Sequence, residues 1–283
     1  MDTSSHTTPL NLPQRVGAWW RERRQARERP GLLRRCPPAT VAASQIPAAV
    51  RAAWMQQAPD ECPGLRVDDD AWLRCSLALA QFFEACRLQR AHGACALPSK
   101  AADSVWHVWL ATDPASLAAW QQRYFDLEVP HLEGAALGAP LDDCLARTWV
   151  GACTSEGLSP LGPQLPLVFA LDGMLALPTG WAYRFERHGL VHRDIDGFGR
   201  THGSGVLHAA VAGTGLVGLG LLGEAELQAW RRQQQPSSDG SACGGIASSD
   251  SGGDGCASSD GGSSGDCGGS SCGGSGCGGG GGS

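Results

Sequence analysis

The chain has 283 residues and a formal net charge of −6, with 18% of its residues charged. The segment after Pro236 contains five aspartates and no lysine or arginine, so it carries most of this charge. The preceding body is therefore close to neutral, and composition gives no reason to expect a specific nucleic-acid partner.

Residues 1–69 form a proline-punctuated N-terminal region with short helical pieces such as Ala48–Gln57. The first residues have neither a basic stretch nor an apolar stretch typical of a signal peptide, which predicts a cytoplasmic protein with reduced thiols. The chain has twelve cysteines. Among those of the body, no pair has the CxxC spacing of a zinc knuckle.

A basic segment at residues 19–35 follows Trp19 and Trp20. It could bind an anionic membrane, RNA or an acidic protein partner. The sequence favours a simpler interpretation, a solvated helix face with pairs such as Glu28 with Arg24, because runs of charge are usually just solvated. The arginines of this segment are Arg21, Arg23, Arg24, Arg27, Arg29, Arg34 and Arg35.

Residues 70–178 are expected to form a helical core domain. Apolar residues at helical spacing predict a first helix from near Asp70 to a stop at Gly93. A second helix is expected to begin at Ser99 as N-cap, and a third at Pro114 in its first turn.

A fourth helix of this domain is predicted from about Leu141 to Glu156, ending at Gly157. The run Pro166–Leu177 is short and apolar, so it could be helix or strand.

Residues 179–235 are expected to contain a small β-hairpin and a glycine-rich connector. Alternation around Trp181, Tyr183 and Phe185 predicts one strand, with a second strand after His188. Gly205–Leu222 is barely long enough for a membrane span, and a buried or loosely packed segment is favoured over a transmembrane helix. The predicted fold class is thus mainly α, with a small β-hairpin and a disordered Gly/Ser/Cys-rich C-terminal tail over residues 236–283.

Asp103, His107 and His131 form the first candidate site. Asp103 and His107 lie four residues apart on a predicted helix and share one face, and a helical hairpin would bring His131 back toward them. Two imidazoles and one carboxylate can hold Zn²⁺ or Fe²⁺. The favoured alternative is that Asp103 caps the helix and His107 is a buried, hydrogen-bonded histidine.

His192, Asp194 and Asp196 form the second candidate site. On a strand, these alternate residues would all point to one face and could bind a metal ion. The favoured alternative is a solvent-facing polar edge. No nucleophile elbow, phosphate loop or HExxH motif is present, so an enzyme is uncertain and a non-enzymatic protein is favoured.

The segment 97–131 resembles the bacterial glycine-rich domain-containing proteins, which have no established activity to carry over. Their Asp-x-x-Trp-His run corresponds to Asp103–His107, and their Tyr-Phe-x-x-x-x-Pro-His run to Tyr124–His131. The chain departs from their pattern at Asp126, where they usually have glycine. Further similarity covers Thr148-Trp149, Ala152-Cys153, Glu156-Gly157, Leu165–Asp172 and the Cys/Gly tail.

The tail cannot pack a core, because it has few apolar residues and glycine loses the most entropy on ordering. A flexible linker has no use for thiols, however, and the tail carries Cys243, Cys256, Cys267, Cys272 and Cys277.

Three functions therefore compete. The best hypothesis is an interaction, assembly or metal-binding protein that contacts another protein through its tail or basic segment. The alternatives are a metal-dependent enzyme using Asp103, His107 and His131, and a tail that is the substrate of azole-forming modification. Membrane association is not favoured.

Overall fold

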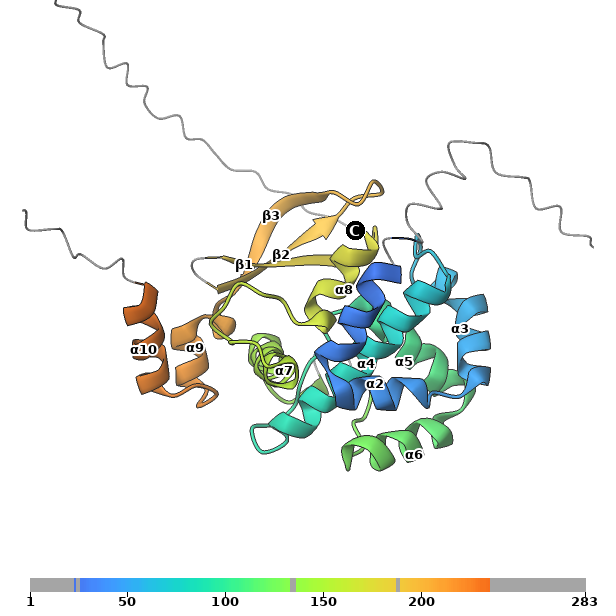
Figure 1. The fold of residues 1–283 in the computed structure, drawn as a ribbon, viewed down its shortest axis with the longest axis horizontal. Coiled ribbons are helices and arrows are strands. Elements are labelled where there is room, and N and C mark those ends of the chain that lie inside the picture. Colours follow the sequence, from blue (N-terminus) through green and yellow to red (C-terminus); the bar gives the residue numbers. More distant parts are fainter. Residues whose placement is uncertain (1–22, 24–25, 133–135, 187–188, 235–283) are drawn as a thin grey trace, which may run out of the picture. The chain divides into compact units, whose positions relative to one another are not determined.

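The computed structural model describes residues 23, 26–132, 136–186 and 189–234. This part is mainly helical and includes a small antiparallel sheet (Figure 1), which confirms the predicted fold class. The predicted disordered tail lies outside the described residues. After helical residues 26–35 come α2 Pro37–Ser44, α3 Ala48–Glu61, α4 Asp69–Gln89, α5 Lys100–Thr112, α6 Pro114–Phe125, α7 Leu141–Glu156, α8 Leu167–Leu175, β1 Trp181–Glu186, β2 Gly189–Ile195, β3 Thr201–His208, the 3₁₀ turn η2 Ala209–Val211, α9 Gly213–Gly218 and α10 Glu224–Gln234.

Capping residues set the helix boundaries. The Asp68 carboxylate accepts a hydrogen bond from Ala71 N at 2.8 Å, and the Ser99 hydroxyl accepts one from Ala102 N at 3.1 Å. Helix α7 has the predicted bounds, and Gly157 ends it in the left-handed region with φ 66°. Each of these capping residues allows hydrogen bonds to backbone groups that a helix end would otherwise leave unpaired.

Helix α4 lies at the centre of the core and packs against α2, α5, α6, α7 and α8 (Figure 1). Helix α3, from the predicted N-terminal region, packs against α5. The fully buried indoles of Trp54 and Trp149 donate their N–H groups to Ser104 Oγ and Pro160 O, each at 2.9 Å. Both indole rings are thus buried with their N–H groups hydrogen-bonded.

Asp172 joins three elements. Its buried carboxylate accepts hydrogen bonds from Ser99 Oγ at 2.6 Å, from the backbone N–H groups of Lys100 and Ala101, and from Trp181 N. Burial raises the pKa of Asp172, and these donors oppose that shift. The sequence left open whether the run Pro166–Leu177 is helix or strand, and the structure shows that it contains the helix α8. Asp172 of this helix binds the first residues of α5 and so fixes where α5 begins.

The sheet has the order β1–β2–β3 with antiparallel pairing. The predicted hairpin between β1 and β2 is confirmed, with Tyr183 opposite His192. The third strand was not predicted: the start of the Gly205–Leu222 segment belongs to β3, and the rest forms η2, α9 and the turn after it. Residues 201–207 are exposed, so the sequence of this strand has no alternation of buried apolar and exposed polar residues. The strand is defined by its backbone pairing with β2.

No helix in the described part of the chain is long and apolar enough to cross a bilayer.

Two residues of the basic segment, Glu28 and Arg35, form ion pairs with the helical body. Arg35 Nε donates to Glu156 Oε2 at 2.6 Å, and Glu28 accepts from Arg74 at 3.0 Å. Arg24, the predicted partner of Glu28, lies outside the described residues. The end of this segment therefore contributes to packing through specific ion pairs.

Candidate metal site

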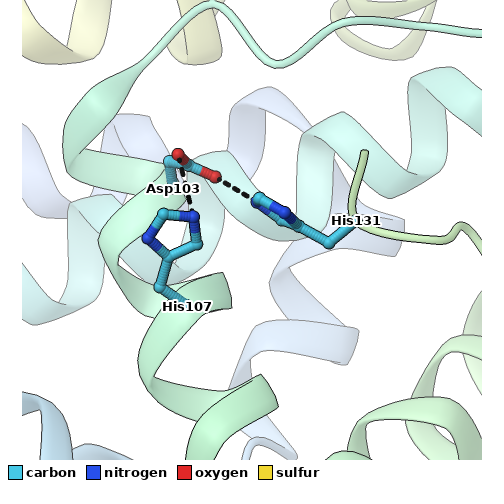
Figure 2. Close-up of side chains that lie close together, drawn as sticks. All are labelled: Asp103, His107 and His131. Carbon is cyan, nitrogen blue, oxygen red and sulfur yellow. Dashed lines mark hydrogen bonds and ion pairs between the residues drawn. The ribbon is translucent and has the colours of Figure 1, made fainter. Parts of the chain in front are cut away.

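Asp103, His107 and His131 line a cavity, and Figure 2 shows their side chains pointing toward one another. The His131 Nε2 atom lies 3.0 Å from Asp103 Oδ1, and His107 Nε2 lies 3.5 Å from Asp103 Oδ2. Among the described residues, these three form the one group of this kind, with one ligand atom from each within 4.8 Å of the others.

Helix α5 supplies two of these side chains. Ser99 caps the helix, so Asp103 does not, and Asp103 and His107 project from adjacent turns. Their side chains are 34% and 40% exposed. The alternative of a capping Asp103 with a buried His107 is therefore wrong, and both groups are open to solvent.

The turn after α6 places His131. Asp126 ends α6 in the left-handed region with φ 53°, and Gln121 Oε1 then accepts a hydrogen bond from Val129 N at 2.6 Å. The His131 ring packs edge-on against Trp106 with ring centroids 4.6 Å apart. The Val129 hydrogen bond and the Trp106 contact thus position His131, and the segment that follows α6 brings it to Asp103.

Glu61, the last residue of α3, also belongs to the site. Its Oε2 atom lies 3.1 Å from His107 Nδ1. A carboxylate at this position favours the tautomer with a proton on Nδ1, which leaves the Nε2 lone pair facing Asp103. Sequence reasoning missed Glu61, because 46 residues separate it from His107 and no motif links them.

The cavity beside the three side chains has a volume of about 540 Å³. Its walls are mostly apolar, and they come from α4 with its cap Arg90, the segment 93–97, α5, the segment 127–132, Leu137 and the first residue of α7, Leu141. Cys86 and Cys95 lie in this wall and interact with each other. The site is therefore open on one side to a space of small-molecule size.

The spacing of the ligand atoms suits a small divalent ion. Two ligands with bonds of about 2.1 Å to a tetrahedral ion lie about 3.4 Å apart. His131 Nε2 lies 3.0 Å from Asp103 Oδ1, and one ligand atom from each of the three residues lies within 4.8 Å of the others. Two imidazoles and a carboxylate match the donors that Zn²⁺ and Fe²⁺ accept, and leave further coordination positions open.

The model of the UCP032817-like family matches residues 55–203, which is more than half of the chain. The chain belongs to the UCP032817-like family. The segment matched by this family contains Glu61 and all three candidate ligands. The comparisons with curated proteins and with solved structures give no match.

The second candidate group lies in the same UCP032817-like segment, but the structure does not bring its three side chains together. A register shift separates His192 from Asp194, whose side chain is exposed. Asp196 Oδ1 accepts hydrogen bonds from the backbone of Phe198 and Arg200, and these bonds lower the pKa of Asp196. Asp196 therefore closes the turn between β2 and β3.

His192 takes part in a different network. Its Nδ1 atom lies 2.7 Å from His208 Nε2, and His208 Nδ1 lies 2.7 Å from Asp142 Oδ1. Burial, followed by the neighbouring His208, lowers the pKa of His192. The network links β2 and β3 to the first turn of α7, and neither His208 nor Asp142 was singled out from the sequence.

The seven cysteines of the body are free and buried. Burial raises the pKa of Cys62 to about 12, which leaves its thiol protonated and unreactive at neutral pH. The tail thiols Cys243, Cys256, Cys267, Cys272 and Cys277 lie outside the described residues.

Proposed function

We propose that this protein binds one divalent transition-metal ion, Zn²⁺ or Fe²⁺, through Asp103, His107 and His131. The observation that carries the proposal is the convergence of three ligand atoms from two segments of the chain. Glu61 adds support, because metal-bound histidines commonly donate their other ring N–H to a carboxylate.

The ion would have open positions toward the cavity. Three protein ligands leave room for water or a bound molecule, which is the arrangement of reactive metal sites, while structural zinc sites are closed by four protein ligands. This feature favours a metal centre that binds a small molecule, and it keeps a metal-dependent enzyme as the second candidate function.

The finer relationship to the bacterial glycine-rich domain-containing proteins is also a proposal. It is supported by the two runs that end at His107 and His131, whose histidines meet at the candidate site. Asp126 supports it as well, because its left-handed φ of 53° is the conformation in which glycine is most easily accommodated.

Metal analysis of the full-length protein tests the metal site. After incubation with Zn²⁺ and removal of excess ion, His107→Ala and His131→Ala should each hold one zinc ion fewer per chain than wild type. His92→Ala is the matched control, since His92 is exposed and lies outside the site. Equal zinc content in wild type and both site variants would overturn the proposal.

Thermal unfolding provides an independent measurement. An ion that binds the folded chain alone stabilises it by RT ln(1 + [L]/Kd), which is about 2.7 kcal/mol at a hundredfold excess over Kd. Zinc should therefore raise the Tm of wild type and His92→Ala, with no such rise for His107→Ala. A chelator that leaves the Tm of zinc-loaded wild type unchanged would contradict the proposal.

A further inference from the structure

The cavity beside the candidate ligands has the size and lining of a small-molecule site. A volume of about 540 Å³ lies within the range of about 300–1,000 Å³ found for ligand pockets. Helix α4 contributes Phe82 and Cys86 from adjacent turns, and Arg90 follows at its C-terminal cap. The ring of Phe82 lies 5.6 Å from that of Trp106, the residue that packs on His131.

The charges around this cavity depend on the metal ion. Two carboxylates, Asp103 and Glu128, and one guanidinium, Arg90, line it. With neutral histidines these three groups carry one net negative charge, and the Glu61 carboxylate beside His107 adds a second. A divalent ion offsets both charges and places its own positive charge at the ligands, so the metal-loaded cavity should attract an anion more strongly than the metal-free one.

We propose that this cavity binds a monocarboxylate with an apolar body, whose carboxylate takes an open position on the metal ion. The inference rests on the proposed metal site. Carboxylate oxygen is a good ligand for Zn²⁺ and Fe²⁺, and the apolar wall between Phe82 and Arg90 removes the body of such a molecule from water.

Arg90 is the other cation of the cavity, but it is a weaker anchor for the carboxylate. Its Nη1 atom lies 3.6 Å from Asp126 Oδ2, and its side chain is 66% exposed. An exposed guanidinium that already has an acidic neighbour gains little from a second carboxylate. The carboxylate is therefore assigned to the metal ion.

Calorimetric titrations of the full-length protein with octanoate, acetate and octylammonium test the inference. Octanoate should bind the zinc-loaded protein at least about tenfold more tightly than the metal-free protein. Acetate should bind at least about a hundredfold more weakly than octanoate, because it lacks the methylenes that the cavity buries. Octylammonium should bind the zinc-loaded protein at least about tenfold more weakly than octanoate.

Variants locate the bound molecule. Cys86→Phe fills the wall from rigid α4, and Ala94→Trp narrows the cavity from an exposed position. Each should weaken octanoate binding at least about tenfold while zinc affinity stays unchanged, which also shows that the variant is folded. Val41→Phe is the control, since Val41 is exposed and lies outside the cavity. Arg90→Gln should leave the affinity for octanoate within about threefold of wild type.

The outcomes separate the two proposals. If the site binds no zinc, both proposals fall. If zinc binds but octanoate affinity does not depend on zinc, or if acetate or octylammonium binds as tightly as octanoate, the metal site stands and this inference is overturned. A tenfold loss in Arg90→Gln alone would also overturn the placement of the carboxylate.

Discussion

At the scale of single residues, Glu61 determines how His107 is presented to an ion. Its carboxylate lies 3.1 Å from His107 Nδ1, on the side of the ring away from Asp103. A charged acceptor there orients the ring and increases the basicity of the coordinating nitrogen.

Glu61→Gln keeps the shape of this side chain and removes its charge. We expect zinc affinity to fall roughly 10- to 100-fold, measured by competition with a chromophoric chelator, with little change in Tm for the metal-free protein. Asp60→Asn is the control, because Asp60 is the exposed neighbour of Glu61. An unchanged Kd in Glu61→Gln would show that Glu61 does not support the site.

At the scale of elements, the contact between α4 and α7 depends on a glycine. A Cβ atom placed on Gly151 would lie 2.8 Å from Ala85 Cα and 2.8 Å from Ala85 O. Backbone atoms of a central helix cannot yield easily, so the two helices approach as closely as they do because residue 151 has no side chain.

Gly151→Ala should therefore destabilise the protein by about 1–3 kcal/mol, despite the better helix propensity of alanine. Gly218→Ala is the matched control: Gly218 ends α9, and an added Cβ would have nothing within 4 Å. Urea denaturation should show a loss for the first variant and none for the second. Equal stability of the two would contradict the close-packing explanation.

The junction between the sheet and α7 predicts a dependence on pH. The pKa of His192 is lowered, so the unfolded chain takes up a proton at a higher pH than the folded chain does. Stability should therefore fall as the pH drops below about 6.5, the ordinary histidine value, toward the lowered value of the native state.

His192→Gln removes this titration. Its free energy of unfolding should decrease less between pH 7 and pH 5 than that of wild type, measured by urea denaturation at each pH. His202→Gln, at an exposed position of β3, should behave as wild type. If wild type and His192→Gln lose the same free energy of unfolding between pH 7 and pH 5, His192 does not cause the pH dependence.

At the scale of the whole molecule, the described helices and strands all belong to one unit, Met1–Pro236. The candidate ligands and the cavity lie inside this unit. The body should therefore bind its ion without the five cysteines of the tail.

Removal of residues 237–283 should leave the Tm unchanged. The shortened chain should still bind the zinc ion that the His107→Ala variant loses. Any additional zinc bound by the full-length chain would then belong to the tail thiols. Zinc content should be measured for both lengths with and without His107→Ala. Loss of the site ion on truncation alone would show that the tail completes the site.

The amino-acid sequence by itself predicted the helices α4, α5, α6 and α7, although α4 ends at Gln89 and not at Gly93. Asp68, Ser99, Pro114 and Gly157 act locally, within one turn of their own backbone, so their effect can be read without tertiary structure. The spacing of Asp103 and His107 on one helix face has the same local origin.

Tertiary structure alone decided the rest. The third strand carries no apolar alternation, and its pairing with β2 comes from the partner backbone. Glu61 reaches His107, His208 reaches His192, and Asp142 reaches His208, because packing of helices and sheet brings together residues far apart in the chain. Such contacts depend on how side-chain volumes fill one shared core, which no local pattern encodes.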